Sequence, residues 1–143
     1  MVTTRMISEP GLWEAREAPA GFHEVALVFD PGGKALYWHD PGGASAGALP
    51  DSRDLWEVLW SQREKLGGVA HTHPGGGIPG PSHTDLTTWA AVEAALGKRL
   101  IWPIVTWDCS AWFGWHGPGR LDYDWVVTDI VIDLRGLRRR SAG

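Results

Sequence analysis

The sequence is poor in several features that would point to particular classes of protein. It contains one cysteine, Cys109, so an intrachain disulfide framework is excluded. No apolar run reaches membrane-spanning length, and the N-terminal MVTTRMISEP lacks the apolar core of a signal peptide. The formal net charge is −4 and no basic stripe crosses the chain, which argues against nucleic-acid binding. Together these absences predict a cytoplasmic protein with neither a membrane nor a nucleic acid as its partner.

The length of 143 residues suits one domain with its own core. One cluster of basic residues, Arg135 to Arg140, stands apart from the body of the chain. Charge blocks of this kind are usually solvated. We therefore expect one domain over residues 1–134 and a basic, disordered tail over residues 135–143.

Tryptophan is unusually abundant, with ten residues in the chain. A platform for carbohydrate binding is one interpretation. The alternative is packing, because Trp56 and Trp60 stand four residues apart beside Leu55 and Leu59, as on one face of a helix. We favour the second interpretation, in which these side chains form core or interface surface.

Hydrophobic patterning and turn residues predict alternating strands and helices. Pro103 falls inside one apolar run, which favours an edge position or a bulge for that strand. The order of elements predicts an α/β fold, a single domain whose mixed sheet is flanked by helices. The expected strands cover 25–30, 35–39, a run ending at His73, 100–107, 111–116 and 125–134, and the expected helices cover 12–18, from 51 or 52 to about 66, and 83–96.

The chemistry-bearing stretch is HTHPGGGIPGPSHTD, from His71 to Asp85. His71 and His73 are two apart at the end of the apolar run GGVA, so on a strand both imidazoles point to one face. Asp85 opens the expected helix 83–96. Two imidazoles and one carboxylate are the protein ligands of a catalytic zinc site, whose fourth position stays open for water. We therefore predict one zinc ion per chain, held by His71, His73 and Asp85.

Ser82 and Asp85 also have a purely structural interpretation. Ser-x-x-Asp ahead of an apolar helix resembles a capping box, which satisfies free N–H groups at a helix start. The two interpretations are compatible, because a cap would also fix the orientation of a ligand.

The order His-x-His-Pro, a short loop and Ser-x-x-Asp resembles the signature of the JAMM (MPN-plus, JAB/Mov34-type) metalloproteases, which include deubiquitinating isopeptidases. His71, His73, Pro74, Ser82 and Asp85 carry the resemblance, and the loop 75–81 is one residue longer than is usual in the family. The resemblance implies a curved sheet between helices, with MPN/JAB-like, cytidine-deaminase-like topology. It implies zinc ligation by His71, His73 and Asp85, and an oxyanion donor role for Ser82.

The resemblance also requires a glutamate near the start of an early strand, to act as the general base. Glu24 fits in HEVALVF, and Glu14 and Glu17 are the alternatives. His23, His39, His83 and His116 are treated as non-ligands, with His83 close enough to touch substrate. Cys109 is interpreted as a buried small residue rather than a reactive thiol.

The expected activity is therefore a zinc-dependent isopeptidase or peptidase. It would cleave an amide bond at the C-terminal tail of a ubiquitin-like or sulfur-carrier protein, with the Gly-rich loop 74–81 either lining a narrow groove or serving as a connector. Two other functions stay open: a non-catalytic scaffold of the same fold that binds a partner, and a zinc hydrolase of small amides.

Overall fold

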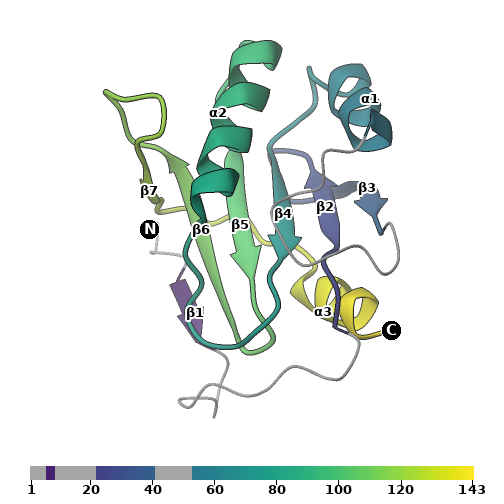
Figure 1. Ribbon diagram of the computed structural model, residues 1–143. Helices are drawn as coiled ribbons and strands as arrows, with labels where there is room; N and C mark the ends of the chain where they lie inside the picture. The colour runs from purple at the N-terminus through teal and green to yellow at the C-terminus, as the bar shows by residue number, and fades with distance from the viewer. Residues whose placement is uncertain (1–5, 9–21, 41–52) are drawn as a thin grey trace.

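The computed structural model describes residues 6–8, 22–40 and 53–143, which form a mixed α/β fold (Figure 1). Its strands are β1 (Met6–Ser8), β2 (Ala26–Phe29), β3 (Ala35–His39), β4 (Gly68–Thr72), β5 (Ile101–Val105), β6 (Cys109–Trp115) and β7 (Tyr123–Trp125). Its helices are α1 (Arg53–Ser61), α2 (His83–Leu96) and α3 (Leu134–Ala142). The expected α/β class with a mixed sheet and flanking helices is confirmed at this level.

The sheet runs in the order β1-β6-β5-β4-β2-β3, and β7 pairs with another part of β6. β4 and β5 are parallel, and the other recorded pairs are antiparallel. The parallel pair requires a crossover, which the loop after β4 and helix α2 provide. The two strands pack closely at Gly68, where an added Cβ would lie 2.0 Å from the carbonyl oxygen of Ile101. Only glycine fits there.

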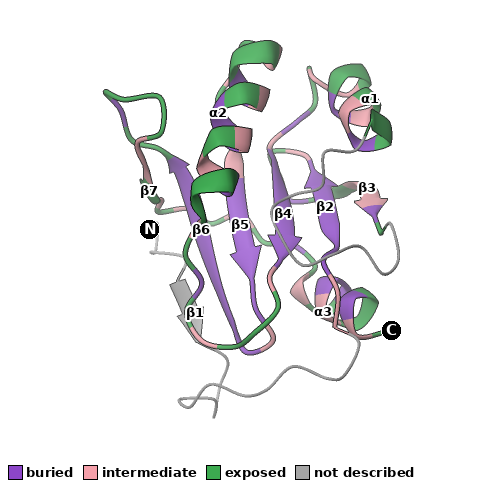
Figure 2. Cartoon of the chain, viewed as in Figure 1, coloured by how far each residue is buried: buried purple, intermediate pink, exposed green. Residues whose placement is uncertain are grey.

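Both faces of the sheet are covered, and the side chains of each central strand alternate between them. In β2, Ala26 and Val28 belong to the cluster that also contains residues of α1 and α2, whereas Leu27 and Phe29 belong to the cluster that contains Leu137 of α3. Figure 2 shows the central strands buried along their length. Burial on both faces explains why β2 and β4 read as continuous apolar runs.

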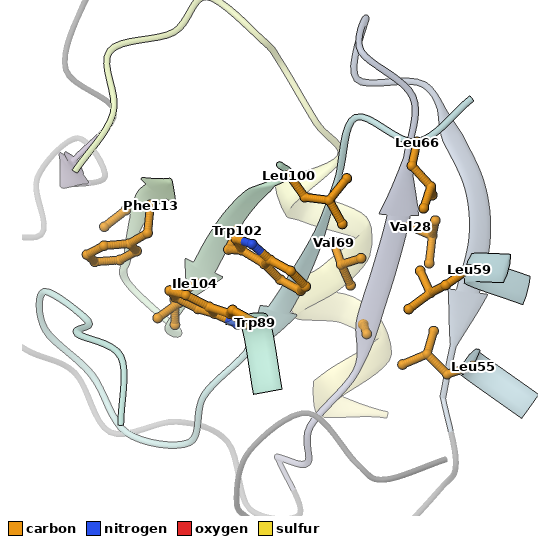
Figure 3. Close-up of a cluster of buried hydrophobic side chains, with 12 residues drawn as sticks. Val28, Leu55, Leu59, Leu66, Val69, Trp89, Leu100, Trp102, Ile104 and Phe113 are labelled. Carbon is orange, nitrogen blue, oxygen red and sulfur yellow. The ribbon is translucent and has the colours of Figure 1, made fainter. Parts of the chain in front are cut away.

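The larger cluster is built around two stacked indoles (Figure 3). Trp89 of α2 lies on Trp102 of β5 with ring centroids 5.4 Å apart and an interplanar angle of 12°. The packing interpretation of the tryptophans therefore holds for these two. It holds for Trp56, which packs partly buried against the cluster, but Trp60 is 47% exposed.

The end of α2 is fixed by a buried carboxylate, Glu93, which is 3% exposed. Its Oε1 accepts from Arg99 at 2.9 Å and from the Tyr123 hydroxyl, and its Oε2 accepts from the Leu100 N–H at 2.8 Å and the Trp102 indole at 2.9 Å. Four donors to one charged group join α2 to β5 and β7. Such a group stabilises the fold only while all its partners are present.

Two sequence predictions are wrong at the far end of the chain. Of the strand expected over 125–134, only Trp125 belongs to β7 and Val127 forms an isolated bridge, and the residues from 128 to 133 form no strand. Residues 135–143 are not a disordered tail, because most of them belong to α3. Leu137 and Ser141 are four residues apart on its buried face, so burial stabilises a helix that its charge would not.

Other differences are smaller. Pro103 lies in the central strand β5, not at an edge, and its missing N–H falls where the recorded β4–β5 pairing is interrupted between Ile101 and Ile104. Helix α1 ends at Ser61 and a turn follows, so the expected extension to residue 66 is wrong. The helix predicted over 12–18 lies outside the described residues, as do Asp51 and Ser52.

Candidate metal centre

The two histidines of the motif lie at the end of β4: His71 belongs to the strand, and His73 follows its last residue, Thr72. Val69 packs in the cluster beneath α2, and His71 follows it on the same face. The N–H of His73 donates to the Val105 carbonyl at 2.9 Å, so the strand geometry continues through this residue. The two imidazole centroids are 4.7 Å apart. His71 is fully buried, whereas the side chain of His73 is 21% exposed, so the site opens to solvent on its side.

Asp85 comes from the first turn of α2, which begins with a complete capping box. The Ser82 hydroxyl accepts from the Asp85 N–H at 3.0 Å, and the Ser82 N–H donates to Asp85 Oδ2 at 2.9 Å. The predicted cap is therefore present. It holds the buried Asp85 carboxylate so that Oδ1 is 3.5 Å from His71 Nε2 and Oδ2 is 3.2 Å from His73 Nε2.

These three side chains fit a metal ion. One ligand atom from each of His71, His73 and Asp85 lies within 4.8 Å of the others, and no fourth His, Cys, Asp or Glu joins the group among the described residues. The Nε2 atoms of both histidines and Oδ1 of Asp85 are buried without a hydrogen-bond partner. Unpartnered buried polar atoms are costly, and a shared cation would satisfy all three.

The charge states of His71 and Asp85 are those that a divalent cation needs. Burial lowers the pKa of His71 below its usual value, against an opposing effect of Asp85, so the imidazole is neutral. Burial alone would raise the pKa of Asp85, but the nearby His71 and His73 imidazoles and the Ser82 N–H outweigh it and hold that pKa well below its usual value. Neutral imidazoles and an ionised carboxylate are the forms that bind metal.

The register of the sheet places Glu24 beside this group. Ala26 of β2 is opposite His71, and the Thr72 N–H donates to the Val25 carbonyl at 3.0 Å, so Glu24 is opposite His73. Glu24 also shares a face with Ala26, the face that α2 covers. The side chain is 2% exposed. Glu14 and Glu17, the alternatives, lie outside the described residues.

Ser82 lies at the solvent side of the group. Its hydroxyl oxygen accepts the cap hydrogen bond, which leaves the hydroxyl hydrogen available as a donor. The residue is exposed, as is the neighbouring His83.

The loop between the ligands is anchored rather than free. The Gly77 N–H donates to Asp108 Oδ1 at 2.6 Å, and the Thr106 hydroxyl donates to the Gly77 carbonyl at 2.7 Å. Gly77 has φ +84°, a conformation that glycine adopts without strain. Sequence reasoning missed Thr106 and Asp108. Their only sequence signal is a pair of polar residues just after a buried strand.

The other histidines lie elsewhere. His23 is bonded to Asp40 at 2.8 Å, His39 is buried in β3, and His116 is exposed beyond β6. Within the part of the chain that the structure describes, the group of possible ligands contains none of these three. Cys109 is buried in β6, which agrees with its interpretation as a packing residue.

Two further observations bear on what kind of protein this is. Among the described residues, no helix has the length and apolar character needed to cross a bilayer. Neither a scan against protein-family models nor searches of curated proteins and solved structures finds a match to this chain.

Proposed function

We propose that this chain is a zinc-dependent hydrolase of amide bonds, an isopeptidase or peptidase of the kind that the JAMM resemblance implies. One observation carries the proposal: two strand histidines and a helix-cap aspartate converge within 4.8 Å with unpartnered ligand atoms, and a buried glutamate is opposite one of those histidines. A structural cap alone would not require the histidines. A structural metal site alone would not require Glu24.

Zinc is the metal that the donor set favours. Two imidazoles and one carboxylate suit a tetrahedral site, and three protein ligands leave one position for water. A zinc ion bound there would polarise the amide carbonyl and lower the pKa of the water towards about 7.

The residues of the chain have distinct roles in this reaction. Glu24 accepts the proton of the attacking water and delivers it to the departing amine, since it is a buried carboxylate on the same face as both histidines. The Ser82 hydroxyl donates to the oxyanion that develops on the carbonyl. Asp85 remains ionised throughout, because the Ser82 N–H and the imidazoles stabilise its charge.

The proposed substrate is the C-terminal tail of a ubiquitin-like or sulfur-carrier protein. The partly exposed His73 and the exposed Ser82 give an extended chain access from solvent. The loop 74–81 borders this access and carries Ile78, which is 57% exposed and offers an apolar contact to a folded substrate. A small amide would not need that surface.

Metal content tests the site. The parent protein, His73→Ala and His116→Ala would be purified side by side and analysed for metal by mass spectrometry after loading with zinc. We expect about one zinc per chain in the parent and in His116→Ala, the matched control, and little in His73→Ala. A parent protein that binds no stoichiometric metal would refute the proposal.

Turnover tests the reaction. A ubiquitin-like domain whose Gly-Gly tail is fused to a reporter would be compared with a short peptide amide. Glu24→Gln should keep its zinc and lose cleavage of the fusion. Zinc binding without cleavage of either substrate would favour the scaffold, and cleavage of the short amide alone would favour a small-amide hydrolase.

A further inference from the structure

Helix α3 lies on the face of the sheet opposite the candidate metal centre, yet it bonds to β4, to the segment before β2 and to the turn after β5 that anchors the ligand loop. Its side of the sheet is the one on which Val25, Ala70 and Val105 pack around Leu137. These residues alternate with the ones that point toward the metal ligands. α3 can therefore affect the centre only through the backbone of the strands between them.

The first connection runs through Thr72, which stands between the two histidine ligands and points the other way. Its side-chain oxygen accepts from the Ser141 hydroxyl at 2.8 Å and from the Val25 N–H at 2.8 Å. The Ser141 carbonyl in turn accepts from the His23 N–H at 2.9 Å. Thr72 and Ser141 are both 0% exposed. One buried pair of hydroxyls thus fixes the strand that carries both histidines to the residues on either side of Glu24.

The second connection runs through Arg138. Its guanidinium donates to the Thr106 carbonyl at 3.0 Å and to the Cys109 carbonyl at 3.1 Å, which fixes the turn between β5 and β6. The same turn holds Gly77 through Thr106 and Asp108. Gly77 lies in the loop that joins His73 to Asp85. Arg138 therefore influences, through this turn, the distance between the ligands His73 and Asp85.

Metal centres tolerate little displacement, because ligand distances vary by only about 0.2 Å. The backbone of β4, of the segment before β2 and of the 74–81 loop sets where the imidazoles, Glu24 and Asp85 lie. Ordinary packing of α3 needs only its apolar side chains. The hydrogen bonds from Ser141 and Arg138 to these particular segments are not required for that packing.

We propose that α3 is a positioning element for the metal centre, acting through Ser141 on Thr72 and through Arg138 on the turn that anchors the ligand loop. Neither residue touches the metal or the substrate. This inference rests on the proposed function, since it assigns the role of α3 at the same site.

The test uses the full chain with single substitutions. Thr72→Val keeps the side-chain shape and removes the hydroxyl, Thr72→Ser restores the hydroxyl, and Ser141→Ala removes its partner. Arg138→Ala is matched with Arg139→Ala, the next residue of α3, which is exposed. Zinc affinity would be measured by competition with a chromogenic chelator, ligand geometry by the visible spectrum of the Co²⁺-substituted protein, and folding by thermal melting of the metal-free forms.

We expect Thr72→Val and Arg138→Ala to weaken zinc binding by about tenfold, the lower end of the loss seen when a group bonded directly to a metal ligand is removed, and to change the Co²⁺ spectrum. Ser141→Ala should have a smaller effect in the same direction. Thr72→Ser and Arg139→Ala should match the parent. A variant that melts lower but binds zinc and Co²⁺ as the parent does has only a structural defect, and this result for both Thr72→Val and Arg138→Ala overturns the inference.

Different measurements would refute the proposed function and the positioning role of α3. A parent protein without zinc overturns the proposed function, and the inference with it. A parent with zinc whose affinity is unchanged in the variants overturns the inference alone. Loss of affinity in Thr72→Val that Thr72→Ser does not restore also overturns it, because the hydroxyl would not be the cause.

Discussion

Ser82 and Asp85 form a helix cap, and Asp85 is also a proposed metal ligand. Substitutions at the two positions can distinguish the contribution of the cap from that of the ligand. Ser82→Ala removes the hydrogen bond from the Asp85 N–H to the Ser82 hydroxyl but leaves the Ser82 N–H on the Asp85 carboxylate. Losing a cap side chain costs about 1 kcal/mol. For a chain of this length that lowers the melting temperature of the metal-free protein by about 3–4 °C. Zinc affinity should change little, because the three ligands remain.

Asp85→Asn should give a different result. The amide oxygen still accepts from the Ser82 N–H, so this hydrogen bond of the cap persists. The negative charge is lost next to the cation, however. Removing one partner of a buried charged pair costs about 3–5 kcal/mol. That cost corresponds to a loss of zinc affinity of about two to three and a half orders of magnitude.

The assays are thermal melting of the metal-free proteins and chelator competition for zinc, run on both variants. Cleavage of the fusion substrate adds a third measurement, in which Ser82→Ala should lose about a hundredfold in turnover because an oxyanion donor is gone. If Asp85→Asn binds zinc as tightly as the parent, the ligand assignment is wrong. If Ser82→Ala melts with the parent, the cap contributes nothing to stability.

Three other predictions concern acid, a buried carboxylate and a close approach of strands. Burial lowers the pKa of His71 in the folded state, so between the folded pKa and the unfolded value of about 6.5 a proton binds the His71 imidazole only in the unfolded chain. The free energy of unfolding of the metal-free parent, measured with urea, should therefore be lower at pH 5.5 than at pH 7.5. The decrease between these two pH values should be smaller in His71→Asn. Glu93→Gln replaces one acceptor oxygen by an amide nitrogen and removes the charge, so in either amide orientation at least one of the four donors loses its acceptor, which should cost about 2–4 kcal/mol in urea unfolding. The exposed Glu57→Gln should cost under about 1 kcal/mol, and equal costs would contradict the Glu93 network. Gly68→Ala would place a Cβ 2.0 Å from the Ile101 carbonyl, so the variant should fail to fold or melt far below the parent, and a normal melting curve would contradict the β4–β5 geometry.

The sequence was sufficient for the parts of the site that are close along the chain. His71 and His73 are two residues apart on a strand and Asp85 opens a capped helix, so local rules place their side chains. The position of Glu24 relative to the histidines depends on the pairing of β2 with β4, which local sequence patterns do not determine. The contacts of Thr72 with Ser141 and of Gly77 with Asp108 join segments 69 and 31 residues apart, and neither pairing has a sequence signal.

The errors at the end of the chain have a common physical origin. β-branched residues over 125–134 favour extended backbone, but extended backbone becomes a strand only where a partner strand is free. Arginines in 135–140 suggested solvation, although Leu134, Leu137 and Ser141 have the spacing of one helical face. Tertiary burial decided both cases against composition.

Under the proposed function, the short distance in sequence between the three candidate ligands would separate metal binding from the assembly of the complete active site. His71, His73 and Asp85 lie within a stretch of 15 residues, so closing a loop between them costs an unfolded chain little entropy. Glu24 reaches them only when β2 pairs with β4, a contact that spans 47 residues between Val25 and Thr72. Long-range strand pairing is the slow part of folding. If the chain binds zinc as proposed, a nascent or partly unfolded chain would hold the ion while it still lacks the proposed base. An ion captured early would then bring the two ends of the ligand loop together before the sheet forms around it.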